Sequence, residues 1–213
     1  MGGRGSSSGK AMPVAEQDAV EYLASGDGMW INNMLRGRHG LMESDMTAED
    51  RKLVKDLDSA LNKAVGEQTL YRSVDASAIF GDSVDMYDLV QEITHKTYSG
   101  QKGKYAQNKA EQLNRVIGGV IGKEITDKGY VSTTRDRNIA ENWQDFTGSE
   151  NPIVLKIQTS KSTKGADISH ATKRLSEIER NNPQKETLLA RNQKYKVKNV
   201  YAQNGFVYVD VTM

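Results

Sequence analysis

The order in which the secondary-structure patterns follow one another constrains this chain most. Apolar residues recur at helical spacing over 14–23 and 53–64, and Thr47 and Asp50 form a capping-box pattern ahead of the second run. The other helical runs lie at 31–37, 86–95 and 107–116. The first third of the chain is therefore predicted to be helical.

Strand-like segments dominate the later part of the chain. They are rich in β-branched and aromatic residues and lie at 69–74, 128–134, 151–159, 186–189 and 204–213. Because helices come first and strands afterwards, we expect an α+β fold with a mostly antiparallel sheet, not a doubly wound α/β fold. We expect a flexible Gly/Ser-rich tail over 1–13, a sign of a domain cut from a longer parent, and one domain over 14–213. Its mainly helical lobe would cover 14–68 and its mixed β core 69–213.

The charge and composition exclude several classes of protein. The chain has 29 Lys and Arg against 28 Asp and Glu, a net charge of +1, so no field of one sign indicates a nucleic acid or an acidic membrane. It contains no cysteine, which excludes disulfides, thiolate nucleophiles and Cys-ligated zinc. No apolar run approaches the roughly 20 residues of a membrane span, and no signal peptide is visible. The three histidines lack metal-like spacing, so we expect no metal site.

Two segments imitate binding motifs. GGVIGKE, 118–124, resembles a phosphate-binding loop but is one residue short and has Glu124 where Ser or Thr should bind magnesium. RNQKYKVK, 191–198, could follow a phosphate backbone, although a solvated edge strand protected by lysines is the simpler interpretation. No serine lies in a GxSxG pattern.

Three polar motifs follow one another in the strand-like segments, after the helical element INNMLRG (31–37). LYRSV carries Arg72, GYVSTT carries Ser132, and PQKETLL carries Gln184 and Glu186. In this order, the motifs resemble the Arg-Ser-Glu branch of the ADP-ribosyltransferase superfamily. That branch includes cholera-type, iota-type and Rho-modifying toxins and some phage-encoded domains, and INNMLRG resembles the helical element that lines their NAD cleft. The resemblance covers roughly residues 14–213.

The resemblance implies a helical lobe packed on a two-sheet β core, with NAD as the only cofactor and no metal. It also implies a monomer with a macromolecular acceptor, a protein more than a nucleic acid, and no membrane. We expect a soluble protein that is cytoplasmic in bacteria or phage-infected cells, virion-associated, or delivered into a target cell as part of a larger protein.

The chemistry of breaking the nicotinamide–ribose bond also favours these residue types. The ribose becomes oxocarbenium-like, so a fixed carboxylate stabilises the transition state. Glu186 would take that role and bind the ribose 2′-hydroxyl as in the relatives, with Ser132 orienting it. Arg72 supplies a permanently charged fork for the diphosphate. The further candidates for the NAD site are Ser73, Thr133, Thr134, Asn32, Arg36 and an aromatic residue, Phe146 or Trp143.

Gln184 indicates the acceptor. Arginine-specific relatives carry glutamate two residues before the catalytic glutamate, whereas Gln-x-Glu resembles members that modify asparagine, glutamine or threonine, or guanine in DNA. Because side chains alternate along a strand, we expect Gln184 and Glu186 to share one face, with Glu186 acting on NAD and Gln184 on the acceptor. The charged segment before them, 169–183, lacks the aromatic that some relatives use to grip a protein.

Three functions therefore stay open. The first is a mono-ADP-ribosyltransferase acting on a protein side chain, with NAD hydrolysis as a side activity. The second is the same site acting on a nucleic-acid base, and the third is a module that kept the fold and lost the activity. Taken singly, Glu186 could be a solvent-facing strand residue and Arg72 a surface ion-pair partner.

Overall fold

The computed structural model describes residues 12–82, 84–143 and 151–213. Its helices are α1 (Val14–Ala24), α2 (Met29–Arg36), η1 (Glu43–Asp45, a 3-10 helix), α3 (Ala48–Ala60), α4 (Ser77–Phe80), α5 (Met86–His95), α6 (Lys104–Val120), α7 (Arg137–Asn142) and α9 (Lys173–Asn181). Its strands are β1 (Thr69–Asp75), β2 (Glu124–Asp127), β3 (Val131–Thr134), β4 (Pro152–Gln158), β5 (Gly165–Asp167), β6 (Glu186–Leu189), β7 (Gln193–Gln203) and β8 (Phe206–Thr212).

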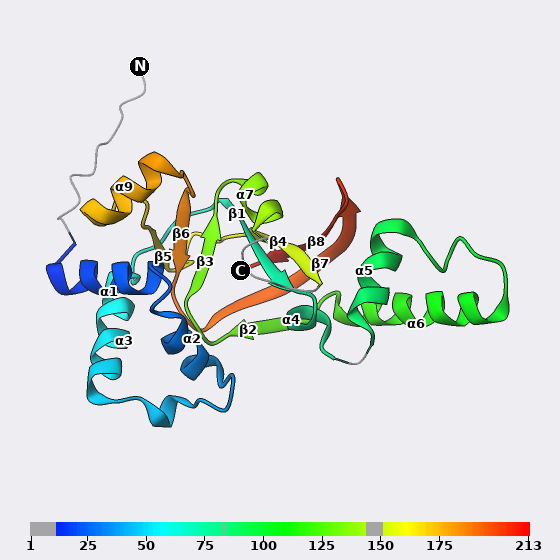
Figure 1. Ribbon diagram of the computed structural model, residues 1–213, viewed down its shortest axis with the longest axis horizontal. Helices are drawn as coiled ribbons and strands as arrows, with labels where there is room; N and C mark the ends of the chain where they lie inside the picture. Colours follow the sequence, from blue (N-terminus) through cyan, green and yellow to red (C-terminus); the bar gives the residue numbers. More distant parts are fainter. Residues whose placement is uncertain (1–11, 83, 144–150) are drawn as a thin grey trace, which may run out of the picture.

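The strands form one sheet in the order β2-β7-β8-β4-β1-β3-β6-β5. β4 and β8 run parallel, and the other neighbours are antiparallel. Figure 1 shows α1, α2 and α3 beside β3, β5 and β6, whereas α5 and α6 extend from the other end of the sheet. The expected α+β fold with a mostly antiparallel sheet is therefore confirmed.

The sheet has two halves that meet at β1 and β3. β1 pairs with β4 along its whole length but with β3 only at Tyr71↔Thr134. One apolar core lies between β1, β4, β7, β8 and helices α4, α5 and α6, and a second core joins α1, α2 and α3 to the strands around β6. Neighbouring residues of β6 belong to different cores, since Leu189 lies in the first and Leu188 in the second. The expected two-sheet core is thus two halves of one continuous sheet.

Local sequence signals account for the helices that border the site. Thr47 and Asp50 form the predicted capping box, in which the Thr47 hydroxyl accepts a hydrogen bond from Asp50 N–H and the Asp50 carboxylate accepts one from Thr47 N–H. α2 ends at Gly37, whose φ of 66° lies in the left-handed region that glycine adopts without strain. These two caps fix where α2 ends and where α3 begins.

The segment 191–198 is not the edge strand that its lysines suggested. β7 lies between β2 and β8, so both of its edges are paired. Tyr195 and Val197 are buried, whereas Lys194 and Lys196, which alternate with them, are exposed. The lysines therefore mark the solvent face of an interior strand.

The charged segment 169–183 is partly helical. It contains α9, which the Thr172 hydroxyl caps by accepting a hydrogen bond from Leu175 N–H, and the Leu175 side chain is buried in the second core. β2 was not predicted either, because its four residues carry little apolar alternation. Within the described ranges, no helix is long and apolar enough to cross a membrane.

Tyr130 ties the helical lobe to the start of β3. Its side chain is buried, and its hydroxyl lies 2.8 Å from Asp58 Oδ1 and 3.0 Å from the Val54 carbonyl oxygen, both on α3. Arg191 binds the same Asp58 carboxylate at 2.9 Å. The aromatic ring and the ion pair together hold α3 against the β core.

We expect Tyr130→Phe to lower the free energy of unfolding by about 1–2 kcal/mol, because a buried hydroxyl loses its bond to a carboxylate while the ring still fills its place. Denaturant unfolding of both proteins measures the change. Tyr105→Phe, at a side chain that is 75% exposed, is the matched control and should leave the midpoint unchanged. Equal unfolding midpoints for Tyr130→Phe and the wild type would contradict this role of the hydroxyl.

Candidate active site

The three polar motifs occupy three neighbouring strands. Arg72 lies in β1, Ser132 in β3, and Glu186 is the first residue of β6. β1 and β3 pair only at Tyr71 and Thr134, so the strands separate beyond this pair. Arg72 on one strand and Ser132 on the other therefore border the place where the two halves of the sheet divide.

Ser132 and Glu186 form a direct contact. The Ser132 hydroxyl donates a hydrogen bond to Glu186 Oε1 at 2.6 Å, across the antiparallel pair of β3 and β6. Burial raises the pKa of the half-buried Glu186 carboxyl, the hydrogen bond from Ser132 lowers it, and the negative charge of Glu179 raises it again. This carboxylate is held in one position and is only partly hydrated.

Thr133 and Thr134 fix the strands around that pair. Both are buried, and the Thr133 hydroxyl donates to the carbonyl oxygen of Thr187, which lies opposite it on β6. The Thr134 hydroxyl donates to the carbonyl oxygen of Gln184 at 2.6 Å. Their hydroxyls thus bind backbone carbonyl groups and hold β3 against β6 and the turn before it.

Arg72 lies in a second cluster, together with Arg36 and Asp127. Arg36 Nε is 2.8 Å from Asp127 Oδ1, and Arg72 Nη1 is 3.7 Å from Asp127 Oδ2. Burial lowers the pKa of the Arg72 guanidinium, whereas the charge of Asp127 raises it. Arg72 Nη1 is buried and makes no hydrogen bond to any part of the chain that the structure describes. It is a charged donor with unused capacity.

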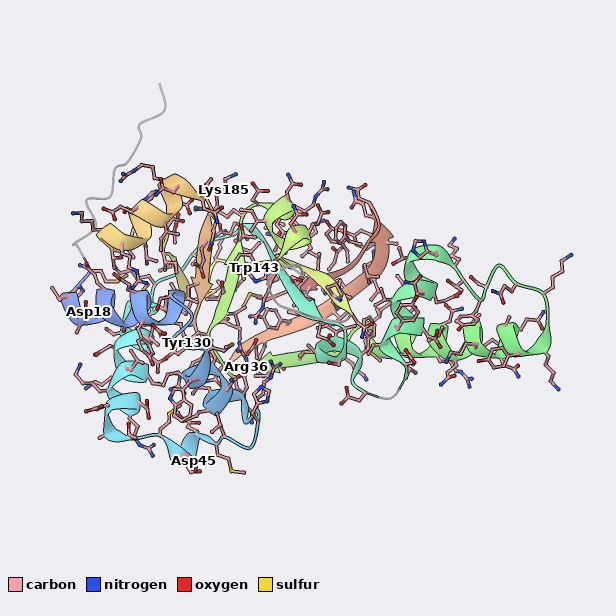
Figure 2. All side chains as sticks on the ribbon, in the orientation of Figure 1. Asp18, Arg36, Asp45, Tyr130, Trp143 and Lys185 are labelled. Atoms are coloured by element: carbon pink, nitrogen blue, oxygen red, sulfur yellow. The ribbon has the colours of Figure 1, made fainter. Side chains whose placement is uncertain are left out.

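Asn32 and Arg36 bind the backbone on both sides of Tyr130. Asn32 Oδ1 accepts a hydrogen bond from Tyr130 N–H at 2.7 Å, and Arg36 Nη2 donates to the Tyr130 carbonyl oxygen at 2.8 Å. Figure 2 shows Arg36 and Tyr130 next to each other, left of the centre of the view. A Cβ at Gly129 would lie 2.7 Å from both Asn32 Oδ1 and Arg36 Cζ, so any other residue here would displace these two side chains. α2 therefore links the arginine cluster to the strand that carries Ser132.

A cavity of about 740 Å³ opens beside the arginine cluster. Its polar lining is rich in cationic side chains, and it includes Arg36, Arg38, His39, Arg72, Ser73, Asp127 and Lys128. Ser132, Glu186 and Gln184 do not line it. The structure thus brings Arg36, Arg72 and Ser73 together along this cavity, whereas Ser132 and Glu186 pair with each other outside its lining. Among the described residues, no group of three or more carboxylate or imidazole side chains is placed to hold a metal ion.

Gln184 does not lie on the strand, so it does not share a strand face with Glu186 as the sequence predicted. β6 begins at Glu186, and Lys185 before it has a φ of 49° in the left-handed region. The backbone N–H of Gln184 donates to Glu179 Oε2 at 2.9 Å. Its side-chain amide makes no hydrogen bond to the described residues, which leaves it available for a ligand.

Of the two aromatic candidates for the NAD site, the structure describes Trp143 alone. Phe146 lies outside the described residues. Trp143 directly follows α7 and is half-buried.

Sequence reasoning did not predict the contacts that Asp127 and Glu179 make in the site. Asp127 follows Ile125 at strand spacing in a segment too short to predict as a strand, and only the fold places it between two arginines. Glu179 belongs to α9, and no local pattern indicates that its carboxylate binds the turn before Glu186.

Comparisons with known proteins agree with this architecture. A sequence model of the ADP-ribosyltransferase exoenzyme family matches residues 7–212, and no curated protein matches the chain. Among solved structures, an ADP-ribosyltransferase from Clostridium botulinum has a TM-score of 0.65 at 22% identity, over 95% of this chain and 88% of that one. The C3 exoenzyme of Clostridium limosum has a TM-score of 0.61 at 20% identity, over 94% and 85%. Vis toxin from Vibrio splendidus, also an ADP-ribosyltransferase, has a TM-score of 0.58 at 14% identity, over 94% and 73%.

At these identities the structural matches establish the shared fold alone. The family model, in contrast, matches the sequence itself over nearly its whole length, which shows membership of the family. This chain therefore belongs to the ADP-ribosyltransferase exoenzyme family.

Proposed function

We propose that this protein is a mono-ADP-ribosyltransferase that transfers ADP-ribose from NAD to a protein side chain, more readily to Asn, Gln or Thr than to Arg. The observation that carries the proposal is the hydrogen bond between Ser132 and the partly buried carboxylate of Glu186, in a fold that also holds a cationic cavity. In this chemistry NAD is consumed, so it is a substrate and not a resident cofactor.

Glu186 is suited to stabilise a developing ribose cation. Its carboxylate is partly buried, so its field on a nearby cation is less screened than in water. Ser132 fixes the carboxylate before the reaction, so little reorganisation is needed as positive charge forms on the ribose. The ribose 2′-hydroxyl would donate a hydrogen bond to the oxygen of Glu186 that Ser132 leaves free.

The arginine cluster is suited to the diphosphate. Arg72 is the principal ligand in this proposal, because its Nη1 is buried without a hydrogen bond to the described residues. Arg36 already binds Asp127 and Tyr130, so its contribution is to hold the cavity wall and add positive charge. Ser73 lines the same cavity and offers a small hydroxyl.

The acceptor preference rests on Gln184. A neutral amide both donates and accepts a hydrogen bond, which suits an amide or hydroxyl acceptor, whereas a guanidinium acceptor favours a carboxylate at this position. Because the Gln184 amide has no partner among the described residues, it is available to an acceptor.

The first test is Glu186→Gln, which preserves the shape of the side chain and removes its charge. NAD hydrolysis without an acceptor should fall by roughly two to three orders of magnitude, because the transition-state cation loses its counter-charge. NAD affinity, measured by calorimetry, should change far less. The control is Glu177→Gln, since Glu177 is exposed on α9 and makes no hydrogen bond or ion pair with the described residues.

Near-wild-type hydrolysis by Glu186→Gln would place the catalytic carboxylate elsewhere. If the folded wild type neither binds nor hydrolyses NAD at millimolar concentration, the protein is an inactive module with this fold.

The second test is Gln184→Ala. Transfer to the native acceptor should fall at least about tenfold while NAD hydrolysis is largely kept, because the ribose chemistry depends on Glu186. Labelled NAD and a cell lysate, followed by protease or nuclease treatment, distinguish a protein acceptor from a nucleic acid. Mass spectrometry then identifies the modified atom, and efficient labelling of arginine by the wild type would contradict the assigned role of Gln184.

The third test is the pH dependence of NAD hydrolysis. The reacting form of Glu186 is the carboxylate, and burial raises its pKa, so the rate should begin to fall at a pH above the ordinary glutamate value of about 4.3. Ser132→Ala removes a hydrogen bond that lowers this pKa, so its acid limb should lie at still higher pH. Circular dichroism at each pH separates titration from unfolding. Acid limbs at or below the ordinary value would contradict the burial of the carboxylate.

A further inference from the structure

The turn before Glu186 is held from two sides. On one side, the carboxylate of Glu179 on α9 accepts hydrogen bonds from Gln184 N–H at 2.9 Å and from Lys185 N–H at 3.1 Å. On the other side, the Thr134 hydroxyl donates to the Gln184 carbonyl oxygen at 2.6 Å, and Arg135 N–H donates to the Lys185 carbonyl oxygen at 3.2 Å. The two residues that directly precede Glu186 are therefore fixed by groups outside the turn.

The conformation of this turn needs such support. Lys185 has a φ of 49°, a left-handed backbone that costs energy for a residue with a Cβ. Hydrogen bonds to an ionised carboxylate are stronger than those between neutral groups, so Glu179 can offset that cost. The residue in this strained conformation stands directly between Gln184 and Glu186.

Glu179 also contributes charge to the site. Its negative charge raises the pKa of Glu186. Two cationic side chains beside the turn already have carboxylate partners: Lys185 pairs with Asp136 at 2.7 Å, and Arg135 with Asp167 at 2.5 Å. Glu179 is thus the charged neighbour whose removal changes the field at Glu186 most directly.

We propose that Glu179 is a positioning residue that anchors the 184–185 turn to α9 and so sets the placement of both Gln184 and Glu186. It does not touch the reacting atoms, and it acts through the backbone of the two residues before the catalytic carboxylate. This inference rests on the proposed function for its kinetic consequences, but the anchoring itself can be measured without catalysis.

The experiment compares Glu179→Ala, Glu179→Gln and the control Glu177→Ala. Amide hydrogen exchange at Gln184 and Lys185, followed by NMR, should accelerate about tenfold or more in Glu179→Ala, because both amides lose a charged acceptor. Glu177→Ala removes the same charge from the same helix without touching the turn, so these two amides should exchange as in the wild type. Melting temperatures confirm that each variant is folded.

The kinetic measurement uses NAD hydrolysis with water as the acceptor. In Glu179→Ala, kcat should fall by about tenfold with KM for NAD changed less than about twofold, since a displaced carboxylate acts mainly in the transition state. Glu179→Gln keeps an acceptor oxygen and should recover most of kcat. Because it removes the negative charge that raises the pKa of Glu186, its acid limb should move to lower pH.

Unchanged exchange at Gln184 and Lys185 in Glu179→Ala would overturn the inference, as would an acid limb in Glu179→Gln identical to that of the wild type. If the wild type itself fails to bind and hydrolyse NAD, the proposed function is wrong, and the exchange rates alone decide whether Glu179 anchors the turn. If Glu179→Ala does not fold, exchange and the acid limb in Glu179→Gln give the answer.

Discussion

The hydrogen bond from Ser132 to Glu186 is the interaction on which the rest of the site depends. It joins residues 54 positions apart, and it forms only because β3 and β6 pair in a register that sets Thr134 opposite Glu186. Burying a carboxylate costs free energy unless it is hydrogen-bonded. The strand pairing sets Ser132 where its hydrogen bond to Glu186 offsets part of that cost. The two threonines after Ser132 secure that register through bonds to the β6 backbone and to Gln184.

The helical lobe holds this strand pair against the arginine cluster. α2 contacts the backbone of Tyr130 from Asn32 and Arg36, and α3 contacts its hydroxyl from Asp58. Asp127 keeps Arg36 and Arg72 together, which reduces the repulsion between two cations beside one cavity. The bonds of α2 to one strand thus connect the cationic cavity to a carboxylate on the neighbouring strand.

The elements that the sequence predicts are those with a local cause. The helix predicted over 86–95 has those bounds in the structure, and the capping box of Thr47 and Asp50 forms as expected. The order of Arg72, Ser132 and Glu186 predicts neighbouring strands, because chains with the same order of motifs share the same sheet topology. Alternation puts Gln184 on the strand only if the backbone is regular up to that residue. Lys185 has a positive φ, which ends the regular strand before Gln184. The contacts of Asp127 and Glu179 depend on tertiary structure alone, so no pattern in the sequence indicates them.

The central claim is that Arg72, Ser132 and Glu186 act on one NAD molecule, although the structure places them in two clusters. A crystal structure of Glu186→Gln with NAD tests it most directly, since this variant should bind without hydrolysing. We expect the diphosphate beside Arg72 in the cationic cavity and the nicotinamide ribose within hydrogen-bond distance of residue 186 and near Ser132. NAD bound away from either cluster, or no NAD at millimolar concentration in a folded protein, would contradict the claim.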